Sequence, residues 1–192
     1  MAGPPTAFIV GDSISIGYTP HVRRALEGRA RVLRHAGNAG DSYNVLSNLG
    51  GWLEGIAPAV LYFNVGLHDL RVWRHTGAHQ VPIEVYRKNA ARLVASLADT
   101  DATLIWATTT PVAAGAAGPD KVFSRTDMDV EAYNAAALEA VREAGIAVND
   151  LNAFVRDRGI ERSLQPDGVH MTDETYADLG AEVARAIGEH LP

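Results

Sequence analysis

Five short apolar runs, separated by longer segments of helical periodicity, set the pattern of this chain. Nearly uninterrupted apolar residues over four to eight positions are typical of buried strands. We expect strands over residues 8–11, 31–36, 59–65, 103–108 and 146–148. Apolar side chains recur at helical spacing between the runs, so strands and helices alternate along the whole sequence.

Capping residues predict where the helices begin and end. Thr19 and Pro20 are predicted as N-cap and first position of the first helix, which Gly28 ends. The second helix starts at Asp41 or Ser42 and stops at Gly50 and Gly51. The others are expected over 82–98, from Thr126 or Asp127 to Gly145, over 151–156, and from Thr172 onward.

This alternation predicts one α/β domain over residues 1–192, with no internal repeat and no low-complexity linker. Parallel strands joined by right-handed helical crossovers favour a three-layer α/β/α sandwich around a five-stranded parallel sheet. The expected strand order is 2-1-3-4-5, as in flavodoxin-like folds. Polar clusters at 11–13, 37–42, 66–69 and 108–111 follow strand ends, so they should meet at one edge of the sheet.

Composition narrows the range of partners. The net charge of −6 is spread along the chain, which argues against nucleic acid as a ligand. There are no cysteines, which fits a reducing compartment. The first residues show no secretory leader, and no segment has membrane-spanning length, so we expect a cytoplasmic protein that does not act at a membrane. Phosphate-binding glycine motifs are absent, so no cofactor is expected.

Ser13 is the candidate nucleophile, because it follows the first strand at the edge where the polar clusters meet. His170 is the best candidate base, and Asp167, three residues earlier, can orient its ring. The Asp167-Gly168 pair is also an ordinary turn sequence, so by itself this segment is equally compatible with a structural role. The GxSxG sequence of the α/β-hydrolases is absent.

Three motif blocks in order resemble the SGNH hydrolase superfamily, also called the GDSL esterase/lipase family. Gly11-Asp12-Ser13 matches its first block, Gly40 the glycine of its second, and Asp167 and His170 its final DxxH block. The resemblance implies the SGNH hydrolase fold, a Ser13–His170–Asp167 triad, and an oxyanion hole that uses the N–H groups of Ser13 and Gly40.

One block departs from the family pattern. The family has Gly-x-Asn-Asp after the third strand, where the Asn side chain donates to the oxyanion, whereas this chain has Gly66-Leu67-His68-Asp69. An imidazole N–H of His68 can take over that donation, depending on its tautomer and charge. Alternatively, His68 packs against Asp69 or the loop, and the site relies on two backbone donors. Asn64 is a weaker substitute.

Several further residues are candidate substrate contacts. Trp73 can stack on a sugar ring, and Arg71 or Arg125 can pair with an anionic group, although a solvated loop explains them equally well. Thr110 and Asp12 are the remaining candidate substrate contacts. For Asp12 and for Asp69, a structural role is favoured. His75 and His79 are four residues apart, but Gly77 between them and the lack of a zinc-protease pattern favour a polar loop over a metal site.

These residues predict a serine esterase that acts on a small soluble acyl ester. An O-acetyl group on a carbohydrate or related metabolite is the favoured substrate, from the family resemblance and the Trp73 loop. An acyltransferase or thioesterase that uses the same triad is the first alternative. A non-catalytic binding module is the second, supported only by His68. Oligomeric state does not follow from these patterns.

Overall fold

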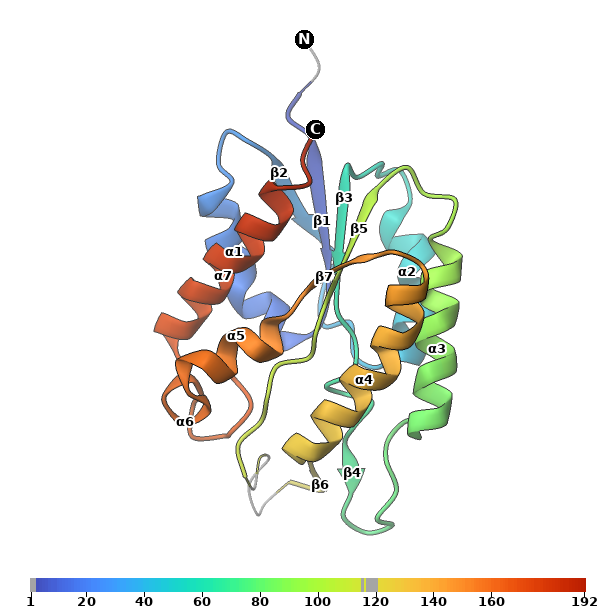
Figure 1. Ribbon diagram of the computed structural model, residues 1–192, viewed down its shortest axis with the longest axis vertical. Coiled ribbons are helices and arrows are strands. Elements are labelled where there is room, and N and C mark those ends of the chain that lie inside the picture. The colour runs from blue at the N-terminus through green and yellow to red at the C-terminus, as the bar shows by residue number, and fades with distance from the viewer. Residues whose placement is uncertain (1–2, 115, 117–120) are drawn as a thin grey trace.

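The computed structural model describes residues 3–114, 116 and 121–192, and centres on a parallel sheet. Its order is β2-β1-β3-β5-β7, which confirms the predicted order of the five sheet strands (Figure 1). All neighbouring pairs in this sheet are parallel. The strands are β1 (Thr6–Val10), β2 (Arg31–Arg34), β3 (Val60–Phe63), β5 (Thr103–Ala107) and β7 (Ala147–Asn149).

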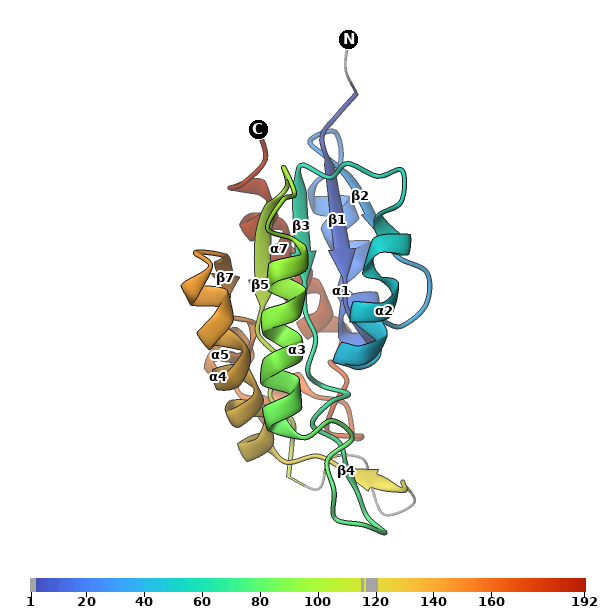
Figure 2. The same cartoon turned by 90° about the vertical axis from the view of Figure 1, so that its right-hand side faces the viewer.

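Helices cover both faces of this sheet and give the three layers. One face carries α1 (Ser13–Ala25), α5 (Leu151–Arg158) and α7 (Asp173–Gly188), and the short α6 (Ile160–Ser163) follows α5. The other face carries α2 (Ser42–Leu53), α3 (Ile83–Ser96) and α4 (Asp127–Glu143), which lie side by side in Figure 2. The α/β/α sandwich is therefore confirmed. No helix in the described part of the chain is long and apolar enough to span a bilayer.

The core lies between these layers and is continuous. All four residues of β3 are buried, as expected for a central parallel strand that is covered on both faces. Phe63 meets Trp106 of β5 edge to face, with ring centroids 5.1 Å apart. Each large aromatic side chain buried in this way removes well over 100 Å² from water, so the sheet centre is a rigid base for its polar edge.

The predicted start of the first helix is wrong. Helix α1 begins at Ser13, and Pro20 lies inside it rather than at its first position. Asp12 is the N-cap, because its carboxylate oxygen Oδ1 accepts the N–H of Ile14 at 2.9 Å. The aspartate cap therefore overrides the Thr19-Pro20 signal, and Ser13 moves from a loop onto the first turn of a helix.

The predicted end of the second helix is also wrong. Helix α2 continues through Gly50 and Gly51 to Leu53. A glycine that ends a helix takes a positive φ, and here Gly55 does so, at 70°. Trp52 stacks on His35 with ring centroids 4.1 Å apart, and this packing favours an extra helical turn despite the two glycines.

A small sheet that the sequence analysis did not predict joins the segment after β3 to the segment after β5. Strands β4 (Val72–Trp73) and β6 (Phe123–Ser124) pair antiparallel. Two-residue strands are too short to show a hydrophobic period, so only the pairing between distant loops defines them. They lie below the carboxyl ends of the main strands in Figure 1, at the opposite end from both termini.

Candidate active site

Ser13 is held at the turn between β1 and α1. A Cβ atom at Gly11 would lie 2.9 Å from the Ser15 side chain, so only glycine allows the chain to turn this closely. The Gly11 N–H donates to His35 Nε2 at 3.3 Å, and Arg34 donates to the Gly11 carbonyl at 3.2 Å. Sequence reasoning missed Arg34 and His35, since residues at the end of a neighbouring strand carry no local motif.

His170 lies beside this serine although the two are 157 positions apart. The distance from His170 Nε2 to Ser13 Oγ is 2.9 Å. On the other side of the ring, His170 Nδ1 lies 2.6 Å from Asp167 Oδ2. The three predicted residues therefore form one continuous chain of hydrogen bonds.

Asp167 is arranged as an ionised acceptor. Its second oxygen, Oδ1, accepts the backbone N–H groups of Val169 and His170, each at 2.9 Å. Partial burial alone would raise the pKa of Asp167, but the His170 ring and the two N–H groups outweigh it and lower this pKa. An ionised carboxylate holds the His170 proton on Nδ1, which leaves Nε2 free to accept the proton of Ser13.

The loop that carries His170 is tied to the rest of the sheet edge. Gly168 adopts a φ of 70°, and its carbonyl accepts the N–H of Ala113 at 2.8 Å. Gln165 donates its N–H to the His170 carbonyl at 2.7 Å. These bonds fix the backbone around the imidazole, so its approach to Ser13 is set by the connection that follows β5.

Gly40 lies in the loop before α2, but its N–H already has a partner. It donates to the side-chain oxygen of Asn38 at 2.8 Å. Asn38 is exposed, so its side chain can rotate away at small cost. A negatively charged oxygen would accept this N–H more strongly than a neutral amide does, so an oxyanion can displace Asn38.

His68 is oriented by an arginine. Arg71 Nη2 lies 3.3 Å from His68 Nε2, and a guanidinium can only donate, so Nε2 accepts and the ring proton resides on Nδ1. Burial, with Arg71 and Arg125 nearby, lowers the pKa of His68 to about 3. The imidazole is therefore neutral near neutral pH and keeps one N–H to donate.

Asp69 bonds to helix α2 rather than to His68. Both of its carboxylate oxygens accept the N–H of Ser42, at 3.0 and 3.1 Å. Asn89 of α3 then donates to the Ser42 hydroxyl at 2.9 Å. Burial raises the pKa of Asp69 to about 7. This buried network ties the Gly40 loop to the His68 loop.

Asp12, Asn64 and Thr110 surround a small cavity. Leu67 and the α1 residues Ile14 and Ser15 also line it. Asn64 donates to the Ala107 carbonyl at 2.7 Å, so its amide is committed to the sheet edge. Burial raises the pKa of Asp12, whose carboxylate serves as the α1 cap. Their contacts with the protein favour support of the edge over contact with substrate.

Arg71, Arg125 and Trp73 surround the ring of Phe123. The guanidinium carbons of Arg71 and Arg125 lie 4.6 and 5.0 Å from the Phe123 centroid. Trp73 meets the same ring edge to face at 6.0 Å. The loop residues proposed from sequence as substrate contacts are thus gathered on one aromatic platform, which the β4–β6 pairing assembles.

His75 and His79 point to different neighbours. His79 Nε2 lies 2.9 Å from Asp129 Oδ1, whereas His75 packs near Trp73, with ring centroids 6.3 Å apart. Within the residues that the structure describes, no three histidine, aspartate or glutamate side chains are grouped to hold a metal ion.

Comparison with known proteins adds to this geometry. The sequence profile of the GDSL-like lipase/acylhydrolase family matches residues 9–177, a span that includes Ser13, Asp167 and His170. The chain belongs to this family. It is therefore an enzyme of the SGNH hydrolase type, as the motif blocks predicted. No curated protein sequence matches the chain.

Several solved structures share this fold. The lipase/acylhydrolase from Enterococcus faecalis has a TM-score of 0.80 at 20% identity, over 98% of this chain and 97% of that one. An acetylxylan esterase from Geobacillus stearothermophilus has a TM-score of 0.74 at 17% identity, covering 99% and 98%. The acetyl xylan esterase AlAXEase gives 0.75 at 16% identity, covering 95% and 99%.

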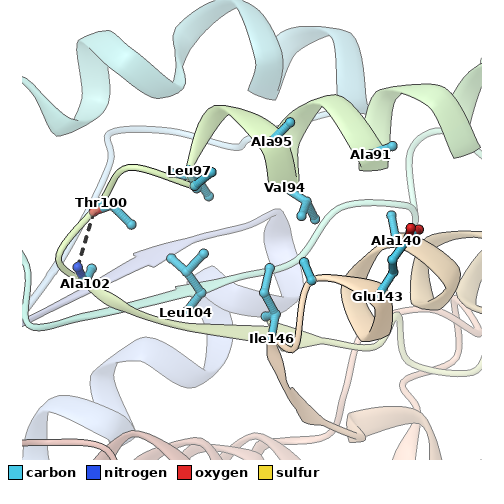
Figure 3. Close-up of a pocket in the computed structure, with 12 residues that line it drawn as sticks. Ala91, Val94, Ala95, Leu97, Thr100, Ala102, Leu104, Ala140, Glu143 and Ile146 are labelled. Carbon is cyan, nitrogen blue, oxygen red and sulfur yellow. Dashed lines mark hydrogen bonds between the residues drawn. The ribbon is translucent and has the colours of Figure 1, made fainter.

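The GDSL-type domain has a second, larger hollow away from this site. It measures about 470 Å³ and lies between α3, α4 and the strand β5 (Figure 3). Its lining is mostly aliphatic, with Val94 from α3, Leu97 at the C-cap of α3, and Leu104 from β5. Size alone does not mark a functional site, because catalysis needs convergent polar groups and this hollow has almost none.

Proposed function

We propose that this protein hydrolyses small acyl esters through a covalent intermediate on Ser13. The observation that carries the proposal is the hydrogen-bond chain from Ser13 Oγ to His170 Nε2, at 2.9 Å, and from His170 Nδ1 to Asp167, at 2.6 Å. Nucleophile, base and orienting carboxylate in this sequence are the requirements for activating a serine hydroxyl. Membership of the acylhydrolase family agrees with this chemistry.

The steps follow from the positions of the protons. His170 Nε2 accepts the Ser13 proton while Oγ attacks the ester carbonyl carbon. The protonated imidazole then donates that proton to the departing alcohol oxygen, which leaves an acyl-Ser13 ester. Water, deprotonated by His170, attacks the acyl carbon, and the proton returns to Ser13 as the acid leaves. Asp167 stabilises the charged imidazole throughout.

The oxyanion of each tetrahedral intermediate is assigned to three donors. Ser13 N–H and Gly40 N–H are the backbone donors, and His68 Nδ1–H takes the place of the family asparagine side chain. The contact of Arg71 with His68 Nε2 supports this assignment, because it leaves the ring proton on Nδ1. Since the low pKa of His68 keeps the ring neutral, this donor does not titrate at working pH.

The favoured substrate is an acetyl ester on a carbohydrate or related metabolite. Two of the solved structures that share the fold are acetyl xylan esterases. The ring of Trp73, in β4, provides an aromatic surface on which a sugar can stack.

Hydrolysis is favoured over acyl transfer by the openness of the site. The side chains of His170 and Asp167 are 38% and 46% exposed, so water reaches the base. A transferase that uses the same intermediate must exclude water from it.

The test compares wild type with Ser13→Ala on 4-nitrophenyl acetate and acetylated xylo-oligosaccharides. We expect kcat/KM to fall by at least about three powers of ten. Labelling by a fluorophosphonate probe should be complete in wild type and absent in Ser13→Ala. Near-full activity in Ser13→Ala, or no labelling of the folded wild type, would overturn the proposal. Added alcohol acceptors test transfer, which would appear as a new ester product.

A further inference from the structure

Arg125 is a buried arginine that contacts no counter-ion in the described part of the chain. Only 6% of its surface is exposed, and its Nε donates to the Leu67 carbonyl at 2.7 Å. Its two terminal nitrogens have no hydrogen-bond or ion-pair partner among the described residues. A buried charge is normally paired, so these free donors are an unusual feature that calls for a ligand.

Arg71 places a second positive charge against the same ring. Its Nη2 contacts His68, and its Nη1 makes a long 3.5 Å contact with Gln80 Oε1. Its Nε is buried and has no hydrogen-bond partner among the residues that the structure describes. Gln80 in turn donates to Asp41 at 2.6 Å and thereby separates that carboxylate from Arg71. Two guanidiniums thus share Phe123, and both keep unused donors.

Two arginines on the surface behave differently. Arg156 contacts Asp127 at 2.7 Å, and Arg185 contacts Glu182 at 2.6 Å. These surface pairs satisfy their guanidiniums within the protein. Arg71 and Arg125 form no ion pair with any described residue, although Arg125 is more buried than Arg156 and Arg185.

The two guanidiniums adjoin the proposed reaction centre. Arg125 is bonded to the residue before His68, and Arg71 is bonded to the His68 ring itself. Asp12 and Asp167 act on Arg125 through space without pairing with it, and the two arginines influence His68 more strongly than Asp41 does. Two positive charges therefore lie beside His68, although the whole chain has a net charge of −6.

We propose that Arg125, supported by Arg71, binds an anionic group of the substrate, a carboxylate or a group of like charge next to the scissile ester. The inference rests on the proposed esterase function and narrows its substrate class to anionic esters. The two terminal nitrogens of Arg125 can donate parallel hydrogen bonds to two oxygens of the anion. Arg71 adds a second positive charge and donates a hydrogen bond to His68.

The test measures kcat/KM for matched pairs of charged and neutral esters. For an anion in the acyl part, 4-nitrophenyl hydrogen glutarate is compared with its methyl ester, after subtraction of uncatalysed hydrolysis. For an anion in the alcohol part, acetate release from acetoxyacetate is compared with release from acetoxyacetamide. The ratio within each pair is independent of the folded fraction, so a destabilised variant still gives a valid result.

In wild type we expect the charged ester of at least one pair to be preferred by about 10-fold or more. Arg125→Met should reduce that ratio about 10- to 100-fold, Arg71→Met should reduce it less, and Arg125→Lys should restore part of it. Arg142→Met removes an exposed charge at the far end of α4 and should leave the ratio unchanged.

Equal or better use of the neutral ester in both pairs by wild type would overturn the inference, and so would an unchanged ratio in Arg125→Met. Either result leaves the esterase proposal standing when Ser13 is still labelled and neutral esters are still hydrolysed in a Ser13-dependent way. Absence of both would overturn the esterase proposal instead. The two failures are therefore distinguishable.

Discussion

The carboxyl edge of the sheet and the hollow between α3 and α4 are opposite kinds of concavity. The edge gathers Ser13, His170 and Asp167 within hydrogen-bond distance of one another. The hollow is large but lined mostly by aliphatic side chains such as Val94 and Leu104 (Figure 3). Burial of polar groups at the edge lowers the free energy of unfolding unless those groups are hydrogen-bonded. The hollow forms where two helices and a strand meet without filling the space between them.

In this structure, buried ionisable groups distinguish the proposed reaction centre from the larger apolar hollow. At the edge, burial lowers the pKa of His68 to about 3 and raises that of Asp69 to about 7. Buried titratable groups with shifted pKa values are typical of functional sites. Substitutions at the edge should change activity or pH-dependent stability, whereas a substitution in the hollow should leave activity unchanged.

Asp167→Asn tests the triad most severely after Ser13 itself. The amide oxygen can still accept the N–H groups of Val169 and His170, so the loop should keep its shape. The amide NH2, however, would donate to Nδ1 and move the imidazole proton to Nε2, which faces Ser13. We expect kcat to fall about 10³- to 10⁴-fold, measured with 4-nitrophenyl acetate. Full activity with an unchanged melting temperature would contradict the assigned tautomer.

His68 is tested by a pair of substitutions. His68→Ala should lower kcat about 10²-fold, because it removes one oxyanion donor. His68→Asn restores the family residue and should stay within about 10-fold of wild type. Since the pKa of His68 is about 3, its titration should add no step between pH 5 and 9, and His68→Asn should keep the wild-type pH profile. Equal activity in the alanine variant would exclude His68 as a donor.

Asp69→Asn tests the buried network through stability rather than rate. Because the folded-state pKa is about 7 and the ordinary value is 3.8, the folded protein holds a proton between these pH values that the unfolded chain has lost. The stabilisation from this proton is present at low pH and is lost as pH rises through about 7.

The stability of wild type should therefore decline relative to Asp69→Asn by up to about 1.4 kcal/mol per pH unit between pH 4 and 7. Urea unfolding of both proteins across this range measures the difference. A constant difference would show that Asp69 is already ionised in the folded protein at pH 4.

Val94→Ala enlarges the α3–α4 hollow and should leave catalysis untouched. Val94 is 9% exposed, so truncation should cost about 1–2 kcal/mol of unfolding free energy. The kcat/KM of the folded enzyme should stay within twofold of wild type, since the hollow contributes nothing to the sheet edge. A large loss of kcat/KM without loss of stability would show that the hollow takes part in function.

Sequence patterns succeeded where the signal is local. The alternation of apolar runs and helical periods predicted the sheet and its order, because continuous burial of β1 and β3 leaves few alternatives. The predicted helix boundaries at Pro20 and Gly50 were wrong. The hydrogen bond that the Asp12 side chain accepts and the packing of Trp52 outweighed the local preferences of proline and glycine. Tertiary contacts of this kind override intrinsic propensity.

The candidate site divides in the same way. The motif blocks selected Ser13, Gly40, Asp167 and His170, because the chemistry requires those residue types in that order. They did not indicate that Asn38 accepts the Gly40 N–H, or that Asp69 bonds to Ser42. Side-chain partners across loops depend on how those loops dock, which no spacing rule describes.

The amino-acid sequence alone determined the family, the layered fold and the identity of the proposed nucleophile, base and orienting carboxylate. Only the tertiary structure decided how β4 and β6 pair, and with that pairing the meeting of Arg71 and Arg125 on Phe123. The physical reason is distance along the chain. Local periodicity and caps are encoded within a few residues, whereas buried charges acquire their neighbours only when segments fifty or more residues apart come together.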